Sequence, residues 1–178
     1  MEVYFLDVGQ GDSELVVFPG GDSLLIDGGG SYFSDFEVGT NIILPFLLQK
    51  KIRVRWVAVS HYHPDHWRGI IEILNIVEPE ELWISSEARE DVCFIELLNS
   101  LNSKIQVRRL LFPFSLKIGE VCIEIVYPEK CQVSDYTHNN LSQVIRISDP
   151  YHSFLFTGDI EKEVEEEIET PAAAFKPD

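Results

Sequence analysis

The sequence has few basic residues and lacks the features that mark secreted or membrane-spanning proteins. Its 14 lysines and arginines are outnumbered by 30 acidic residues, which gives a formal net charge of −16. A negative charge of this size disfavours non-specific attraction to phosphate backbones and anionic membranes. The start, Met1-Glu2-Val3-Tyr4, is not the basic and apolar stretch of a signal peptide, and no run of about 18 apolar residues predicts a membrane span. We therefore expect a soluble, cytoplasmic protein.

Cysteine is also scarce, and its spacing excludes two common uses. Cys93, Cys122 and Cys131 are odd in number and share no C-x-x-C spacing, so they fit neither a disulfide framework nor a zinc ribbon. Hydrophobic residues nevertheless make up 45% of the 178 residues, enough for a real core. We predict one domain over residues 1–178.

Short apolar runs separated by turn signals predict many strands with helices between them. Helices are expected over 40–51, with Thr40 as the N-cap, and over about 67–77 and 89–101. A final acidic helix carries Ile160, Val164 and Ile168 on one apolar face. This mixture favours a layered α+β or α/β sandwich. The expected strands are 3–8, 14–18, 23–26, 56–59, 82–85, 105–110, 116–118, 121–126, 144–147 and 154–156.

Three of the five histidines lie within six residues, directly after an apolar strand. His61, His63, Asp65 and His66 form the pattern H-x-H-x-D-H. Neutral imidazole suits zinc and related ions, and a carboxylate adds charge and accepts harder metals. The pattern therefore predicts a metal site, and the alternative is a polar, exposed loop that binds nothing. His152, alone at a turn, is expected to be a surface residue.

A hydrolytic site needs a second carboxylate, and two aspartates are placed to contribute. Asp159 follows an apolar strand and a glycine, so it should project from a sheet edge as His61 does. The alternative makes Asp159 the N-cap of the next helix. Asp27 also ends an apolar strand, and it could orient a ligating histidine or be an ordinary loop residue.

Together these motifs resemble those of the metallo-β-lactamase superfamily. The H-x-H-x-D-H segment with Gly69 is similar to the signature loop of these hydrolases, Asp27 to their first motif, and Gly158-Asp159 to their bridging-aspartate motif. Three further segments are similar to the ComEC-like subgroup of competence proteins: Phe5-Leu6-Asp7-Val8-Gly9-Gln10-Gly11-Asp12-Ser13, Leu25-Ile26-Asp27-Gly28-Gly29 and Asn139-Asn140-Leu141-Ser142.

The resemblance implies a four-layer αβ/βα sandwich with two divalent metal ions at one edge of its sheets. Zinc is the expected metal, with manganese or iron as alternatives. The resemblance places His61 and His63 on one ion, Asp65 and His66 on the other, and Asp159 between them. Asp65 and His66 are also the expected catalytic residues. The expected supporting or substrate-contacting residues are Asp12, Asp27, Arg68, His138, Asn139, Asn140 and Ser142.

Two departures from the family pattern change these expectations. Trp67 and Arg68 stand where relatives usually have a small or aliphatic residue and a glycine, and Arg68 is a candidate contact for an anionic substrate. In the ComEC-like subgroup the third-motif histidine is replaced by the Asn-Asn-x-Ser segment, and His138 is a candidate to restore that ligand. The sequence also stops before the family's His-His-Gly-Ser segment. We therefore expect an incomplete C-terminal part and self-association through an open sheet edge.

The leading functional hypothesis is metal-dependent phosphodiesterase or nuclease activity. ComEC-like relatives are associated with DNA uptake, so DNA or a small anionic diester is the expected substrate. A metal-binding or regulatory module with little catalysis is one alternative, and a hydrolase of small thioesters or lactams is another. Fold alone does not separate these possibilities.

Overall fold

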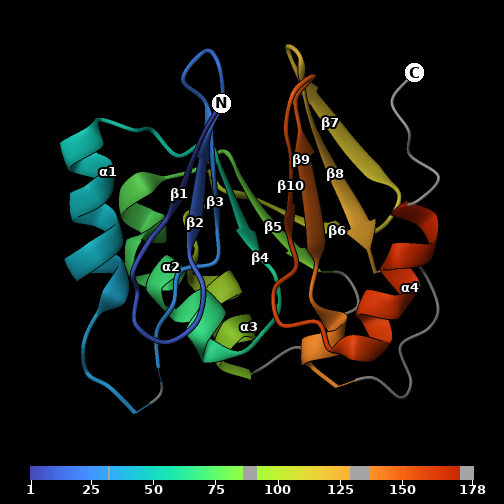
Figure 1. Cartoon of the computed structure of the whole chain (residues 1–178). Helices are drawn as coiled ribbons and strands as arrows, with labels where there is room; N and C mark the ends of the chain where they lie inside the picture. Colours follow the sequence, from blue (N-terminus) through green and yellow to red (C-terminus); the bar gives the residue numbers. More distant parts are fainter. Residues whose placement is uncertain (32, 86–91, 129–136, 173–178) are drawn as a thin grey trace.

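The protein is a sandwich of four layers in which two β-sheets face each other. The computed structural model describes residues 1–31, 33–85, 92–128 and 137–172. Helices α1 (Leu44–Lys50), α2 (Pro64–Val77) and α3 (Val92–Ser100) lie on the outer face of the first sheet. Helix α4 (Lys162–Ala172) lies on the outer face of the second (Figure 1). The expected αβ/βα architecture is confirmed.

The first sheet sets the position of the histidine-rich segment. Its strands lie in chain order, with β1, β2 and β3 antiparallel and β3 to β6 parallel. Because β3 and β4 are parallel neighbours, their carboxyl ends meet at one edge, which brings Asp27 beside Ser60. The strands are β1 (Glu2–Phe5), β2 (Glu14–Val17), β3 (Ser23–Ile26), β4 (Trp56–Val59), β5 (Glu81–Ser85) and β6 (Gln106–Leu110).

The second sheet is antiparallel and carries Asp159. Its spatial order is β10-β9-β8-β7, and the β7–β8 hairpin turns at Gly119 and Glu120. Buried and partly exposed residues alternate along β8, which is the pattern of a strand with one face in the core. The strands are β7 (Phe114–Ile118), β8 (Val121–Tyr127), β9 (Val144–Ser148) and β10 (Ser153–Phe156).

Three apolar clusters hold the four layers together. One packs the first sheet against its helices, with Val57 and Ile73 among its fully buried members. The second lies between the sheets, where Trp83 faces the side chains of β8 and β9. The third is smaller and buries Val164 of α4 against the second sheet, with Ile160 and Ile168 packed beside it. The apolar face predicted for the acidic helix is confirmed for Val164 and Ile168, whereas Ile160 packs there from the loop before the helix.

Several predicted element boundaries were wrong. Helix α2 begins at Pro64, earlier than expected, because proline is well suited to the first turn of a helix, where its missing N–H costs nothing. Thr40 is not an N-cap, since it lies inside a short π-helix (Gly39–Ile43) that precedes α1. Its hydroxyl bonds to Glu37 instead. Strand β1 ends at Phe5 rather than at residue 8, because the chain leaves the sheet there to form the turn that follows.

The structure tests the sequence expectations about membrane spans, sheet edges and cysteines only in part. Within the described residues, no helix is long and apolar enough to cross a membrane. Strands β1 and β10 are the edges of their sheets on the same side of the sandwich, and their Phe5 and Phe156 rings lie 6.5 Å apart. Self-association through such an edge stays a prediction. Cys122 is a free thiol, whereas the Cys93 side chain and Cys131 lie outside the described residues.

Substituting Gly69 tests the close packing of α2 on the loop after β3. A Cβ at Gly69 would lie 2.0 Å from the Gly28 carbonyl oxygen, so backbone must move to admit it. We expect Gly69→Ala to lower Tm by roughly 5 °C or more. Gly9→Ala is the control, because Gly9 has a positive φ of 81° but no atom within 4 Å of the added Cβ. Thermal melts showing equal losses for both variants would contradict this packing.

Candidate metal centre

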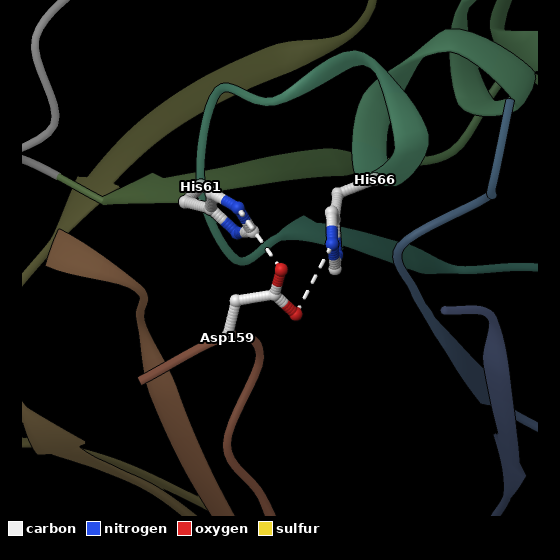
Figure 2. A group of neighbouring side chains, drawn as sticks. All are labelled: His61, His66 and Asp159. Carbon is white, nitrogen blue, oxygen red and sulfur yellow. Dashed lines mark ion pairs between the residues drawn. The ribbon is translucent and has the colours of Figure 1, made fainter. Parts of the chain in front are cut away.

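Three side chains carried by both sheets converge at one end of the sandwich. His61 lies two residues after β4, His66 lies in the first turn of α2, and Asp159 lies three residues after β10. His61 Nε2 is 4.0 Å from Asp159 Oδ2, and His66 Nε2 is 3.4 Å from Asp159 Oδ1. One potential ligand atom of each residue lies within 4.8 Å of the other two. Figure 2 shows the carboxylate between the two rings, with one oxygen toward each.

Asp27 supports both histidines through buried hydrogen bonds. Its carboxylate accepts the Ser60 backbone N–H at 2.7 Å, the Ser60 hydroxyl at 2.6 Å and the His66 Nδ1–H at 2.8 Å. Asp27 is only 1% exposed, so these charge-assisted bonds act in a low-dielectric environment that strengthens them. Its φ of 53° is uncommon for a residue other than glycine and costs roughly 1 kcal/mol. The hydrogen bonds offset that cost.

The same contacts determine which ring nitrogens face Asp159. The Ser60 hydroxyl gives its single proton to Asp27, so His61 Nδ1, 3.0 Å from Ser60 Oγ, must donate to that oxygen. His61 Nε2 therefore carries the lone pair. His66 Nδ1 is likewise engaged by Asp27, which leaves Nε2 directed at Asp159. Both histidines present Nε2 to the centre, as metal-ligating histidines with a supporting acceptor do.

The charges around the cluster favour a cation. Burial alone would lower the pKa of His66, but the negative charges of Asp27 and Asp159 raise it to about 11. Burial and the neighbouring His66 charge lower the pKa of His61 to about 4, so this ring is neutral. The hydrogen bond from His66 holds the pKa of Asp159 below its ordinary value. A neutral imidazole and an ionised carboxylate are the protonation states that bind metal.

The loop that carries Asp159 is tied to the Asn-Asn-x-Ser segment. The Asp159 amide donates to Ser142 Oγ at 3.3 Å. The Asn140 side chain accepts the Glu161 amide at 2.7 Å and donates to the Glu161 carboxylate at 3.0 Å. Asn139 lies in the short 3-10 helix Asn139–Leu141, beside Asn140. Asn140 and Ser142 thus position the Asp159 loop rather than join the cluster.

The residue before Asp159 and the start of α4 both bear on the placement of Asp159. A Cβ at Gly158 would lie 2.9 Å from Ser60 Oγ, so only glycine allows this loop to approach the end of β4 so closely. Helix α4 begins at Lys162, three residues beyond Asp159. The alternative that Asp159 is the N-cap of this helix was therefore wrong.

His63 and His138 lie beside the cluster without belonging to it. His63 Nδ1 is 3.1 Å from His61 Nε2, and its ring stacks on that of His138 at 5.5 Å between centroids. His138 is exposed. A role for either histidine as a ligand stays a prediction that this arrangement supports.

Asp65 and Arg68 point to other partners. The Asp65 carboxylate accepts a hydrogen bond from Gln10 at 3.3 Å. The Arg68 guanidinium donates to the Ser31 carbonyl, which anchors the loop after β3. Contact of Arg68 with an anionic substrate stays a prediction. His152 is exposed and bonds to Asp149, as expected for a surface histidine.

Glu14 is a largely buried carboxyl that the sequence reading missed. Burial, and then the nearby charges of Asp27 and Asp12, raise its pKa to about 8. Burial also raises the pKa of Asp12. Glu14 is in phase with Val16 along β2, and Val16 lies in the apolar cluster between the sheets. An acidic residue at a strand position that faces the core is the sequence signal that could have identified Glu14.

Ser60 was the other residue that the sequence reading overlooked. It occurs next to His61 and looks like an ordinary strand-end serine. Its role depends on the pairing of β3 with β4, which brings the Asp27 carboxylate within reach. No local pattern reveals such a contact.

Comparisons with known proteins point to one superfamily. Residues 6–92 match the family described as the metallo-beta-lactamase superfamily. The chain is 30% identical over 167 residues to the uncharacterized protein YcaI of Escherichia coli K12 and 30% identical over 193 residues to ComE operon protein 3 of Bacillus subtilis 168. Each match covers 94% of this chain but only 20% and 23% of the relatives. The chain thus spans about a fifth of the curated relatives it matches.

Solved structures show the same fold at low sequence identity. The metallo-beta-lactamase fold protein YhfI from Bacillus subtilis superposes with a TM-score of 0.54 at 18% identity, over 89% of this chain and 63% of that one. The BLEG-1 B3 metallo-beta-lactamase superposes with a TM-score of 0.57 at 13% identity, over 88% and 71% of the two chains. Both likenesses concern the fold alone.

Asp27→Asn tests whether this buried carboxylate supports the two histidines. An amide keeps the shape but places N–H groups where an acceptor is required, so His66 loses its orientation. We expect zinc affinity, measured by competition with a chromogenic chelator, to fall roughly 10- to 100-fold. Asp7→Asn, the same change at an exposed position, should leave affinity unchanged. Unchanged affinity in the Asp27 variant would return this residue to an ordinary loop role.

Glu14→Gln tests the cost of burying this carboxyl. Folding raises its pKa from 4.5 to about 8. Its contribution to stability is therefore complete below the unfolded pKa and is lost as pH rises through about 8. Relative to the Gln variant, the wild type should lose unfolding free energy between about pH 5 and pH 9. Urea titrations across this range measure the difference, and exposed Glu120→Gln is the control. Parallel pH curves for wild type and Glu14→Gln would refute the expectation.

Proposed function

We propose that this chain, which carries a domain of the metallo-beta-lactamase superfamily, is a metal-dependent hydrolase that acts on phosphodiesters. The observation that carries the proposal is the convergence of His61, His66 and Asp159. Superfamily members are generally hydrolases, and the fold implies divalent metal binding. The likeness to ComE operon protein 3 supports a phosphodiester over other substrates, with DNA as one candidate.

The residues of the centre fit a divalent metal on three counts. Two imidazoles and a carboxylate are a donor set that suits zinc, manganese or iron. Both Nδ1 atoms already have partners in Ser60 and Asp27, so His61 Nε2 offers a lone pair and His66 Nε2 would offer one once a metal displaces its proton. The two Asp159 oxygens face different histidines, which supports a bridging role between two ions. His63 and Asp65 would complete the pair of sites.

The chemistry then divides between the metal and the protein. Divalent cations held here would supply Lewis acidity, which activates water and stabilises negative charge on the ester oxygens. Asp27 keeps the His66 ring oriented through its Nδ1, and Ser60 fixes the tautomer of His61. Asn140 and Ser142 hold the loop that presents Asp159. No serine or cysteine nucleophile is required.

Metal content and a substrate panel test the proposal. Protein purified without chelator and reconstituted with zinc or manganese should retain metal and cleave bis(p-nitrophenyl) phosphate or single-stranded DNA. Asp159→Asn should lower both metal content and turnover, the latter at least about 100-fold. Asp149→Asn is the matched control, because Asp149 also follows a strand of the second sheet but at its opposite end.

The outcomes separate the alternatives. Bound metal without turnover of any diester, thioester or lactam would favour a binding or regulatory module. Turnover of a thioester or of nitrocefin alone would favour a small-molecule hydrolase. Less than about a tenth of an equivalent of metal after reconstitution would overturn the metal centre itself.

A further inference from the structure

A cavity of about 200 Å³ lies between the two sheets, beside the candidate metal centre. Asp27 and Ser60, which contact the two histidines, form one side of it, and Gly158, the neighbour of Asp159, forms another. Its volume corresponds to roughly six or seven waters at about 30 Å³ each, enough for a short alkyl chain with a polar head. A group bound there would lie next to the reaction centre.

Two polar groups that line this cavity lack a hydrogen-bond partner in the described part of the chain. The Glu14 carboxyl has no hydrogen bond or ion pair within the described part of the chain. Gln143 is 1% exposed; its amide nitrogen donates to the Leu110 carbonyl at 3.4 Å, but its Oε1 has no partner among the described residues. A buried acceptor that lacks a donor is costly, so a ligand that supplies donors would be favoured.

The cavity also selects for positive charge. Asp12, Glu14 and Asp27 line it, and no lysine, arginine or histidine is among its lining residues. Burial, and then the charges of Asp27 and Asp12, raise the pKa of Glu14, and a cation bound beside it would favour its ionised, accepting form. Phe5 and Phe156 supply aromatic surface, with ring centroids 6.5 Å apart, and aromatic rings attract cations. A phosphate or carboxylate would be repelled, whereas a cation with several N–H donors matches every feature.

We propose that this cavity binds a protonated primary amine, with Glu14 and Gln143 as its acceptors. The ammonium group carries three donors and a full charge, which suits two acceptors in an acidic, partly aromatic cavity. Resting on the proposed function, we infer further that this amine belongs to the substrate. A phosphodiester with an amino alcohol as one of its two ester groups would place its phosphorus at the metal centre and its ammonium in the cavity, while water displaces the other ester group as an alcohol or phenol.

Binding to metal-free protein tests the cavity independently of hydrolysis. The full chain, treated with chelator and kept in an amine-free buffer, is titrated with ethanolammonium chloride and followed by ¹H–¹⁵N NMR. Sodium chloride at equal ionic strength controls for charge screening. The neutral probe 1-propanol, which has the same number of heavy atoms, controls for apolar binding. We expect saturable shifts at the Gln143 side-chain amide with ethanolammonium and none with 1-propanol.

Substitutions in the lining test whether ethanolammonium binds in this cavity. Glu14→Gln, which keeps the shape, should weaken ethanolammonium binding roughly 10- to 100-fold. Gln143→Met should weaken it about fivefold or more, and Glu120→Gln should leave it unchanged. Equal binding of 1-propanol, or unchanged binding in Glu14→Gln, would overturn the proposal. Loss of binding in Asp159→Asn with retention in Glu14→Gln would assign the amine to the metal centre and equally overturn it.

A substrate comparison then tests the further step. Metal-loaded protein should cleave a p-nitrophenyl phosphodiester of ethanolamine at least about tenfold more efficiently than the matching propyl diester. Glu14→Gln should remove that preference while still cleaving the propyl diester. Cleavage of both diesters at equal rates would refute the substrate assignment but leave the proposed hydrolase intact. Absence of all cleavage with intact amine binding would instead count against the hydrolase alone.

Discussion

A buried carboxylate that accepts three hydrogen bonds joins the end of β3 to the end of β4 and the first turn of α2. Asp27 makes these bonds at 2.6 to 2.8 Å. Losing any of these hydrogen bonds would cost stability, because no water can replace the missing partner of a buried charge. The positions of Ser60, His61 and His66 therefore depend on one side chain. Its left-handed backbone conformation shows that the fold tolerates local strain to keep it there.

Much of the fold could be predicted because each strand shows either alternating apolar and polar residues or a continuous apolar run. Clear turn signals separate the strands. The predicted strands 23–26 and 56–59 have the observed bounds. The start of α2 was missed because Pro64 follows His63 in a segment that looks like a loop, although proline is common in the first helical turn. Boundaries depend on such local competition, whereas the existence of an element depends on its whole apolar pattern.

The candidate site was predictable as a set of residues but not as a set of distances. The H-x-H-x-D-H spacing identifies His61 and His66, yet only strand pairing and sheet packing place Asp159 between them. Asp65, one residue from His66, accepts a hydrogen bond from Gln10, and its place on a second ion stays a prediction. Glu14 shows a limit of sequence patterns, because its burial arises from the facing sheet, which no local window contains. The same packing of the two sheets also places Asp12, Asp27 and Glu14 around one cavity.

Each sheet is built from one continuous stretch of the chain, residues 2–110 for the first and 114–156 for the second. The histidines belong to the first stretch, whereas Asp159 lies just beyond the second. A chain that emerges from the ribosome with its N-terminus first can complete one half while the other is still being made. The cluster therefore needs contacts between residues about 100 positions apart, which form late because closing so long a loop costs entropy. A chain arrested before Asp159 would carry both histidines without the carboxylate that joins them.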